Sequence, residues 1–234
     1  IQFKEEALSR YLAPILKADQ DLMIHTSQDS STHQALNAIT AVKKKFPDSN
    51  SRITLAHVNM VRDSDFKRFK ELDIVANIQP FDAQGGGYYE YRYMLYDDQW
   101  ENKLARYRHF FDEGVRVSAS SDYPACNKPL QECSPFHGIQ IGMTRQKIGA
   151  IADEEILSSA DERLSLEQSI RAYTINGAWQ DHLDMVKGSI EVDKVADFCV
   201  IDQDILNVDP AKIGEISVEM TIVGGEVVYS RQTP

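Results

Sequence analysis

The sequence predicts an α/β protein with a parallel sheet, followed by a small β module. Short runs rich in β-branched residues alternate with segments of helical periodicity, as in parallel strands joined by crossover helices. From Val186 onward, short strands and turns replace that alternation, and Gly224-Gly225 has the pattern of a two-residue hairpin turn. We therefore expect two regions, residues 1–185 and residues 186–234.

Five segments have the residue spacing of helices. The first is expected to be interrupted near Pro14, because proline cannot donate a backbone hydrogen bond inside a helix. Two others have capping signals, Ser31 with Gln34 and Ser165 with Gln168. The predicted helices are Gln2–Lys17, one that begins at Ser31, Asp65–Leu72, one whose stripe Trp100, Leu104, Tyr107 and Phe111 ends at Gly114, and one that begins at Ser165.

Three polar residues share a position at the end of a predicted strand: His25, His57 and Asp122. Taken singly, a histidine is more often structural, and Asp122 has about even odds of being only a turn cap. In a parallel barrel, however, the carboxyl ends of the strands converge on the catalytic rim. The predicted strands are Leu22–His25, Ile53–His57, Ile74–Gln79, a run through Val115 and Val117, Ala196–Ile201, Ser217–Val223 and Glu226–Tyr229.

Two neutral imidazoles and a carboxylate suit a divalent metal, with zinc as the expected ion. Such a metal lowers the pKa of bound water toward about 7. We therefore predict that His25, His57 and Asp122 bind metal, and that Asp122 also acts as the catalytic general acid and base.

The other histidines are weaker candidates. His33 is expected to face solvent, His109 to lie on a helix and His182 in a loop. His137, in a loop fifteen residues after Asp122, is within reach of the rim, although a hydrogen bond within the loop is favoured.

A long loop, residues 81–99, contains three consecutive glycines and several tyrosines. Long loops in compact domains are usually functional or disordered, and tyrosine combines apolar area with a hydroxyl. We interpret the loop as a lid that faces substrate, with an ordered surface flap as the alternative. Gln79, Tyr88 and Tyr123 are the candidate substrate-binding residues.

The composition limits the partners. The 234 residues carry a formal charge of −11, which argues against nucleic acid and anionic membranes. No apolar stretch approaches the roughly 20 residues that span a bilayer. Three cysteines are too few for a disulfide scaffold. We expect a cytoplasmic protein that acts on a small molecule.

Several short motifs occur in the order seen in the amidohydrolase superfamily, and the sequence resembles the branch that includes N-substituted formamide deformylase. The resemblance runs from Leu22 to Tyr229. The motifs are His25–Asp29, Arg52–His57, Ile78–Pro80, Ser121–Pro124, Arg171–Asn176, Gly188–Ile190, Ala196–Phe198 and Thr221–Gly225.

This resemblance implies a metal-dependent hydrolase that cleaves carbon–nitrogen bonds other than peptide bonds, with an amide-like substrate. It implies strands 5 to 8 of a TIM-like (β/α)8 barrel, followed by strands of a small β-sandwich built from both chain ends. His25, His57 and Asp122 match the metal-binding histidines and the proton-shuttling aspartate of the family. The chain departs from the family at Gln28, where glycine is common, and at Ala56, where an acidic residue is usual.

The family's first metal-binding histidine pair has no counterpart, so we expect this chain to be the carboxyl-terminal half of a longer protein, inactive by itself. Four strands leave an open sheet edge, which makes a homo-oligomer an expectation. Two alternatives stay open: a non-catalytic half-barrel that binds a ligand or partner, and a deiminase or isomerase on the same fold.

Overall fold

The computed structural model describes residues 4–84, 103–125, 133–150, 156–157 and 160–231. The chain forms two compact units, Ile1–Ile78 with Glu90–Ser118 and Gln79–Tyr89 with Ala119–Pro234. The expected division between residues 185 and 186 stays a prediction.

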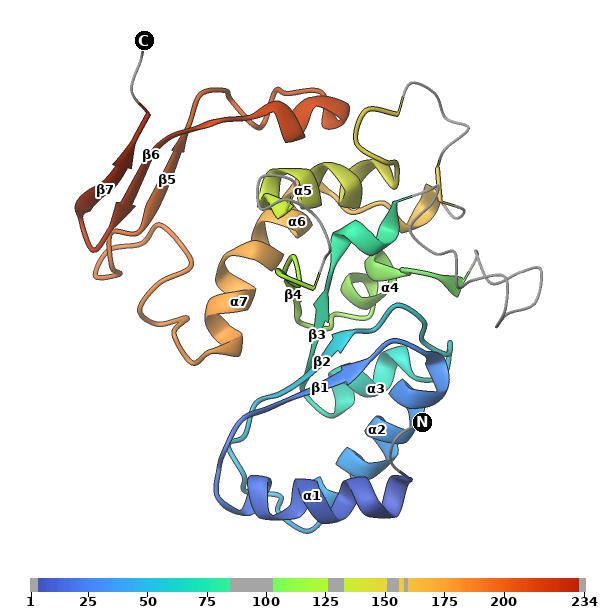
Figure 1. Cartoon of the computed structure of the whole chain (residues 1–234). Helices are drawn as coiled ribbons and strands as arrows, with labels where there is room; N and C mark the ends of the chain where they lie inside the picture. The colour runs from blue at the N-terminus through green and yellow to red at the C-terminus, as the bar shows by residue number, and fades with distance from the viewer. Residues whose placement is uncertain (1–3, 85–102, 126–132, 151–155, 158–159, 232–234) are drawn as a thin grey trace. The chain divides into compact units, whose positions relative to one another are not determined.

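A sheet with the strand order β1-β2-β3-β4 organises the first part of the chain (Figure 1). Strand β1 pairs in parallel with β2, and β2 pairs in parallel with β3. The predicted alternation of strands and helices is therefore confirmed. The elements are α1 (Glu5–Lys17), β1 (Leu22–Thr26), α2 (Asp29–Lys43), β2 (Ile53–His57), α3 (Phe66–Glu71), β3 (Ile74–Ile78), α4 (Tyr107–Asp112) and β4 (Val117–Ala119).

The core of this unit lies between the sheet and its helices. All five residues of β3 are buried, as a strand enclosed on both faces requires. The rings of Phe66 and Phe69 each meet Phe110 edge-on, with centroids 4.8 and 4.9 Å apart, so α3 and α4 pack through aromatic contacts. Strand β1 differs, because Met23 remains 55% exposed at the edge of the sheet.

Two predictions about helix starts and interruptions are wrong. Helix α1 continues through Pro14 to Lys17, because a proline near the carboxyl end removes only the backbone hydrogen bond to Arg10. Helix α2 begins at Asp29, before the predicted cap Ser31. The Ser31 hydroxyl instead accepts a hydrogen bond from the Gln28 amide and donates one to the Gln28 carbonyl, at 3.2 and 2.8 Å.

The helix predicted from Trp100 to Phe111 is shorter than expected, because α4 begins only at Tyr107. Leu104 instead forms an antiparallel bridge with Met60, and Ala105 has a φ of 51°. Leu104 is apolar because it is buried against another segment, and its spacing from Tyr107 and Phe111 only coincides with that of a helix. Trp100 lies outside the described residues. Gly114 ends α4 with a φ of 67°, as predicted.

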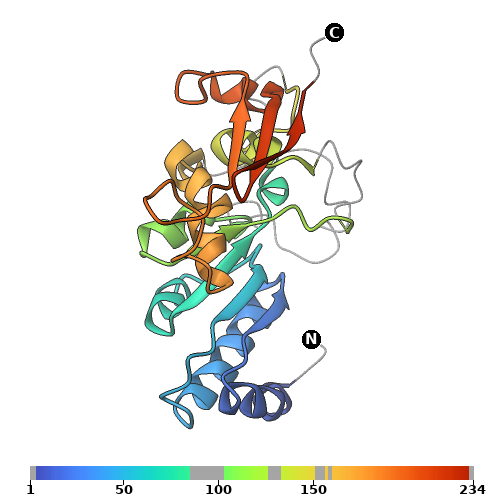
Figure 2. The same cartoon turned by 90° about the vertical axis from the view of Figure 1, so that its left-hand side faces the viewer.

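The second unit contains short helices and a separate antiparallel sheet with the order β5-β6-β7 (Figure 2). Gly224 and Gly225 connect β6 to β7 with φ values of 59° and 84°, which confirms the predicted two-residue turn. Ser165 and Gln168 form the predicted reciprocal cap. The elements are 3-10 helix Pro80–Ala83, α5 (Pro135–Thr144), 3-10 helix Ala160–Glu162, α6 (Leu166–Tyr173), α7 (Ile175–Gln180), β5 (Phe198–Ile201), 3-10 helix Pro210–Glu215, β6 (Val218–Val223) and β7 (Glu226–Ser230).

A small apolar cluster joins α5 to the chain that leads into β6. Ile139 of α5 is buried with Ile213 and Ile216, and Ile201 of β5 packs against them. The Gln140 side-chain oxygen also accepts a hydrogen bond from the Gly214 amide at 2.7 Å. The second layer of the expected sandwich stays a prediction. Within the described residues, no helix is long and apolar enough to span a membrane.

Candidate metal centre

The register of β1 and β2 does not by itself bring the two strand-end histidines together. His25 pairs with Ala56, whereas His57 pairs with Thr26. Paired residues of a parallel sheet present their side chains to the same face, and successive residues alternate. With an extended backbone, His57 would therefore point to the opposite face from His25.

The backbone at the end of β2 resolves this mismatch. His57 has a φ of 71° and Val58 a φ of 42°, a conformation that is uncommon outside glycine and rare for β-branched residues. Rotation about the N–Cα bond carries the Cβ atom of His57 away from the direction that the strand pleat would give it. The rings of His25 and His57 lie with their centroids 4.3 Å apart and their planes inclined by 57°.

Backbone hydrogen bonds hold this arrangement beyond the strands themselves. The Val58 amide donates to the Thr26 carbonyl at 2.7 Å, and the Met60 amide donates to the Ser27 carbonyl at 3.1 Å. The buried Thr26 hydroxyl donates to the Ala56 carbonyl at 3.2 Å. His25 is exposed and His57 is half-buried.

Asp122 belongs to the second unit, three residues after the end of β4. It is exposed and has a φ of 57°. Its neighbour Tyr123 is 54% exposed, and the Tyr123 amide donates to the Ser121 hydroxyl at 3.3 Å. In the described part of the chain, no three His, Cys, Asp or Glu side chains gather as a metal-binding group.

The candidate substrate-binding residues have different surroundings. Gln79 is buried, and its side-chain amide donates to the Ser120 hydroxyl at 2.8 Å. Tyr88, with most of the predicted lid, lies outside the described residues.

Sequence reasoning missed a buried polar pair on β3 and β4. Asn77 of β3 pairs with Ala56, which itself pairs with His25, so the three residues occupy one row across the sheet. The Asn77 side-chain amide donates to the Ser118 hydroxyl of β4 at 2.9 Å, and both residues are buried. The signal was a polar residue inside an otherwise apolar run.

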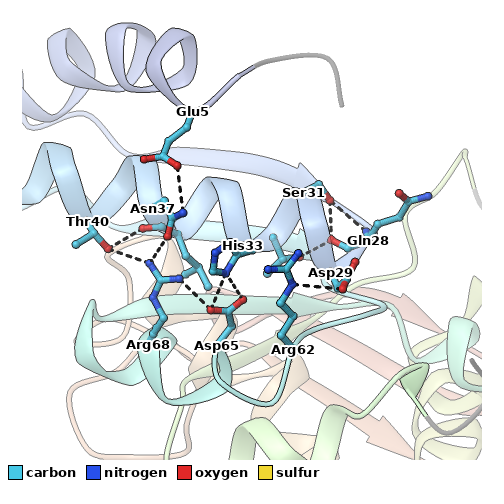
Figure 3. A network of polar contacts seen from close by, with 12 residues as sticks. Glu5, Gln28, Asp29, Ser31, His33, Asn37, Thr40, Arg62, Asp65 and Arg68 are labelled. Atoms are coloured by element: carbon cyan, nitrogen blue, oxygen red, sulfur yellow. Dashed lines mark hydrogen bonds and ion pairs between the residues drawn. The ribbon is translucent and has the colours of Figure 1, made fainter.

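The prediction that His33 faces solvent is only partly correct, because its side chain is 33% exposed but one ring nitrogen is bonded within the fold. Its Nδ1–H donates to the Asp65 carboxylate at 2.8 Å, and Arg68 donates to the same carboxylate at 2.9 Å (Figure 3). Arg68 also bonds Asn37 of α2, which donates to Glu5 of α1. Because Asp65 is 1% exposed, this network is a structural connection between α1, α2 and α3.

The remaining three histidines lie away from the ends of β1 and β2 in the sequence, on two helices and a turn. His137 was expected in a loop but lies on α5, where its ring packs against the backbone of Gly214. His109 lies on α4 as predicted, and its ring is 4.3 Å from that of Phe66. His182 lies in a turn with a φ of 59°.

Two adjacent imidazoles at the carboxyl ends of parallel strands fit a divalent metal in donor type and in position. A backbone forced into the left-handed region beside them fits as well, since such conformations cluster at functional sites. The first unit thus provides two of the three predicted ligands.

Comparison with known proteins finds a matching family and several similar proteins. Residues 1–229 match the amidohydrolase family. Over 216 residues, the chain is 29% identical to an N-substituted formamide deformylase from Arthrobacter pascens, covering 90% of this chain and 37% of that protein. Over 169 residues it is 43% identical to an imidazolonepropionase from Bacteroides thetaiotaomicron, covering 72% and 33%.

A solved structure shares the fold. An uncharacterized metal-dependent hydrolase from Pyrococcus horikoshii aligns with a TM-score of 0.71 at 20% identity, covering 89% of this chain and 39% of that one. The chain therefore spans well under half the length of these three relatives.

Proposed function

This chain belongs to the amidohydrolase family, and on that premise we propose that it supplies part of the active site of a metal-dependent hydrolase. The bond cleaved is a carbon–nitrogen bond other than a peptide bond. The observation that carries the proposal is the approach of His25 and His57, whose rings lie 4.3 Å apart at the ends of neighbouring strands. A relative named as a metal-dependent hydrolase with the same fold supports it.

In this proposal His25 and His57 would hold a divalent metal, with zinc as the expected ion, and Asp122 is the third ligand that the sequence predicts. A bound zinc supplies Lewis-acid chemistry that makes water nucleophilic near neutral pH. The Asp122 carboxylate would accept a proton from the attacking water and would deliver it to the leaving nitrogen, so that the amine departs neutral. Gln79, Tyr88 and Tyr123 are proposed to orient the substrate.

The proposed substrate is a small amide-like molecule. Two relatives with different names, an N-substituted formamide deformylase and an imidazolonepropionase, support this class. The active protein is proposed to be longer than this chain, with the barrel and the sandwich completed by the additional residues. An N-substituted formamide and imidazolonepropionate are therefore the first substrates to assay with the longer protein.

A calorimetric titration of this chain with zinc tests the assignment of the metal ligands. We expect His25→Ala and His57→Ala each to weaken zinc binding at least about tenfold, because each removes a donor. His182→Ala, which alters an exposed histidine of the other unit, is the control and should bind as the unaltered chain does. Equal affinity in all four proteins would refute the assignment.

A further inference from the structure

We propose that the segment Leu104–Arg106 is a positioning element for His57. It holds the backbone after β2 so that His57 keeps its left-handed conformation and its ring stays beside His25. This inference rests on the proposed function, since it explains how one of the two proposed metal ligands is oriented.

The contacts of this segment begin two residues after His57. The Ala105 amide donates to the Asn59 carbonyl at 2.7 Å, and Leu104 forms its bridge with Met60. On the other side, the Val58 amide donates to Thr26 at the end of β1, and the Met60 amide donates to Ser27 directly after it. The residues that follow β2 are therefore fixed from both sides.

Side chains strengthen the same attachment. Arg106 forms an ion pair with Asp63, and its guanidinium lies 5.1 Å from the centre of the Phe66 ring. Ala105 is completely buried and has a φ of 51°, so the segment itself adopts a conformation that an L-residue disfavours. A residue keeps a left-handed backbone conformation inside a packed region only where the surrounding contacts hold it there.

The positioning follows from the geometry of β2. Its register alone would direct His57 away from His25, whereas with a positive φ at His57 the two ring centroids lie 4.3 Å apart. An extended backbone after β2 would move Asn59 and Met60, and with them the bond to Ala105. The contacts to Leu104 and Ala105 therefore oppose the conformation in which the two rings separate.

Substitutions at Ala105 test this inference. Ala105→Gly keeps the amide donor and tolerates positive φ, so zinc affinity should stay within about twofold of the unaltered chain. Ala105→Pro removes the donor and forbids positive φ, so zinc affinity should fall at least about tenfold. If the proline variant does not fold, Ala105→Val replaces it with the same expectation, because β-branched residues resist this conformation.

Two further measurements separate positioning from general destabilisation. Phe69→Leu weakens the core of the same unit, where Phe69 is fully buried, and should lower Tm without changing zinc affinity. In the metal-free chain, a nuclear Overhauser effect between the His25 and His57 rings should disappear in the proline or valine variant and persist in the glycine variant and in Phe69→Leu.

Unchanged zinc affinity and an unchanged ring contact in the disrupted variant would overturn the inference. So would equal losses of zinc affinity and ring contact in Phe69→Leu. If neither this chain nor the longer protein binds zinc, the proposed function fails, whereas the ring contact alone still decides the positioning role.

Discussion

His57 and Val58 each adopt a backbone conformation that costs an L-residue roughly 1–2 kcal/mol. This cost is offset by the hydrogen bonds on both sides of the loop and by the burial of Val58, which is 1% exposed. With this backbone conformation the His57 imidazole lies beside His25, whereas the strand register alone would place the two side chains on opposite faces of the sheet. The position of the His57 ring is defined by its dihedral angles as much as by its place in the sequence.

The buried hydroxyl of Tyr173 leads to a prediction about stability. Its side-chain oxygen is buried and has no hydrogen-bond partner among the described residues, and burial raises the pKa of the phenol well above its usual value. We expect Tyr173→Phe to be as stable as the unaltered protein at pH 7, or about 1 kcal/mol more stable, since an unsatisfied hydroxyl is removed.

The pH dependence follows from that raised pKa. Above about pH 10 the unfolded tyrosine loses its proton while the folded one keeps it, so unfolding is favoured by about 1.4 kcal/mol for each further pH unit. Tyr173→Phe should lose less stability than the unaltered protein in urea denaturation between about pH 9 and pH 11. Parallel loss in both proteins would contradict this account, and Tyr229→Phe on exposed β7 is the control.

The site residues differ in how well a sequence predicts them. His25 and His57 follow from polarity at the ends of apolar runs, which is local information. The positive φ of His57 and the partner of His33 depend on segments about 30 residues or more away, such as Asp65 and Leu104, and no local pattern contains them. The assignment of His25, His57 and Asp122 as metal ligands stays a prediction.

At the scale of elements, the strands and the Ser165–Gln168 cap follow from the sequence, whereas helix starts and lengths do not. The Leu104 bridge shows why, since a residue buried by a distant partner carries the same apolar signal as one on a helix. The same holds for Ser31, which caps from inside α2 rather than before it. Tertiary contacts decide such boundaries.

Gly188 shows how an element is held by a close backbone approach. It has a φ of 96°, and a Cβ atom there would lie 2.7 Å from the Cβ of Ala178 and 2.9 Å from the Cα of Ile175 in α7. Gly188→Ala should therefore destabilise the protein by about 2–4 kcal/mol, because steric overlap adds to backbone strain. Chemical denaturation measures the change.

Gly149→Ala is the matched control for Gly188→Ala. Gly149 also has a positive φ, 81°, but a Cβ atom there would meet nothing within 4 Å. Its substitution should cost only the strain, about 1 kcal/mol. Equal losses at the two positions would show that α7 does not constrain Gly188.

At the scale of the whole molecule, the open edge of the first sheet is the feature that favours association with another chain. Strand β1 has a neighbour on one side only among the described strands, and its Met23 and His25 are exposed. Exposed edge strands tend to pair with another chain unless charge or cover prevents it. The deformylase and the hydrolase structure that this chain resembles are each more than twice its length.

We predict that this chain self-associates through β1 when studied alone. Met23→Lys should shift the molecular mass measured by light scattering toward the monomer, because an edge lysine opposes pairing. Tyr11→Lys, a similarly exposed position on α1, should leave the mass unchanged. A chain that is monomeric before any substitution would contradict this prediction.

The central claim is that His25 and His57 bind one metal ion together. Zinc K-edge X-ray absorption on the zinc-loaded chain counts imidazole ligands directly. The account predicts two imidazoles at about 2.0–2.1 Å in the unaltered chain and one in His57→Ala. Bound zinc that retains its imidazole count in His57→Ala, or that has no imidazole ligand at all, would contradict it.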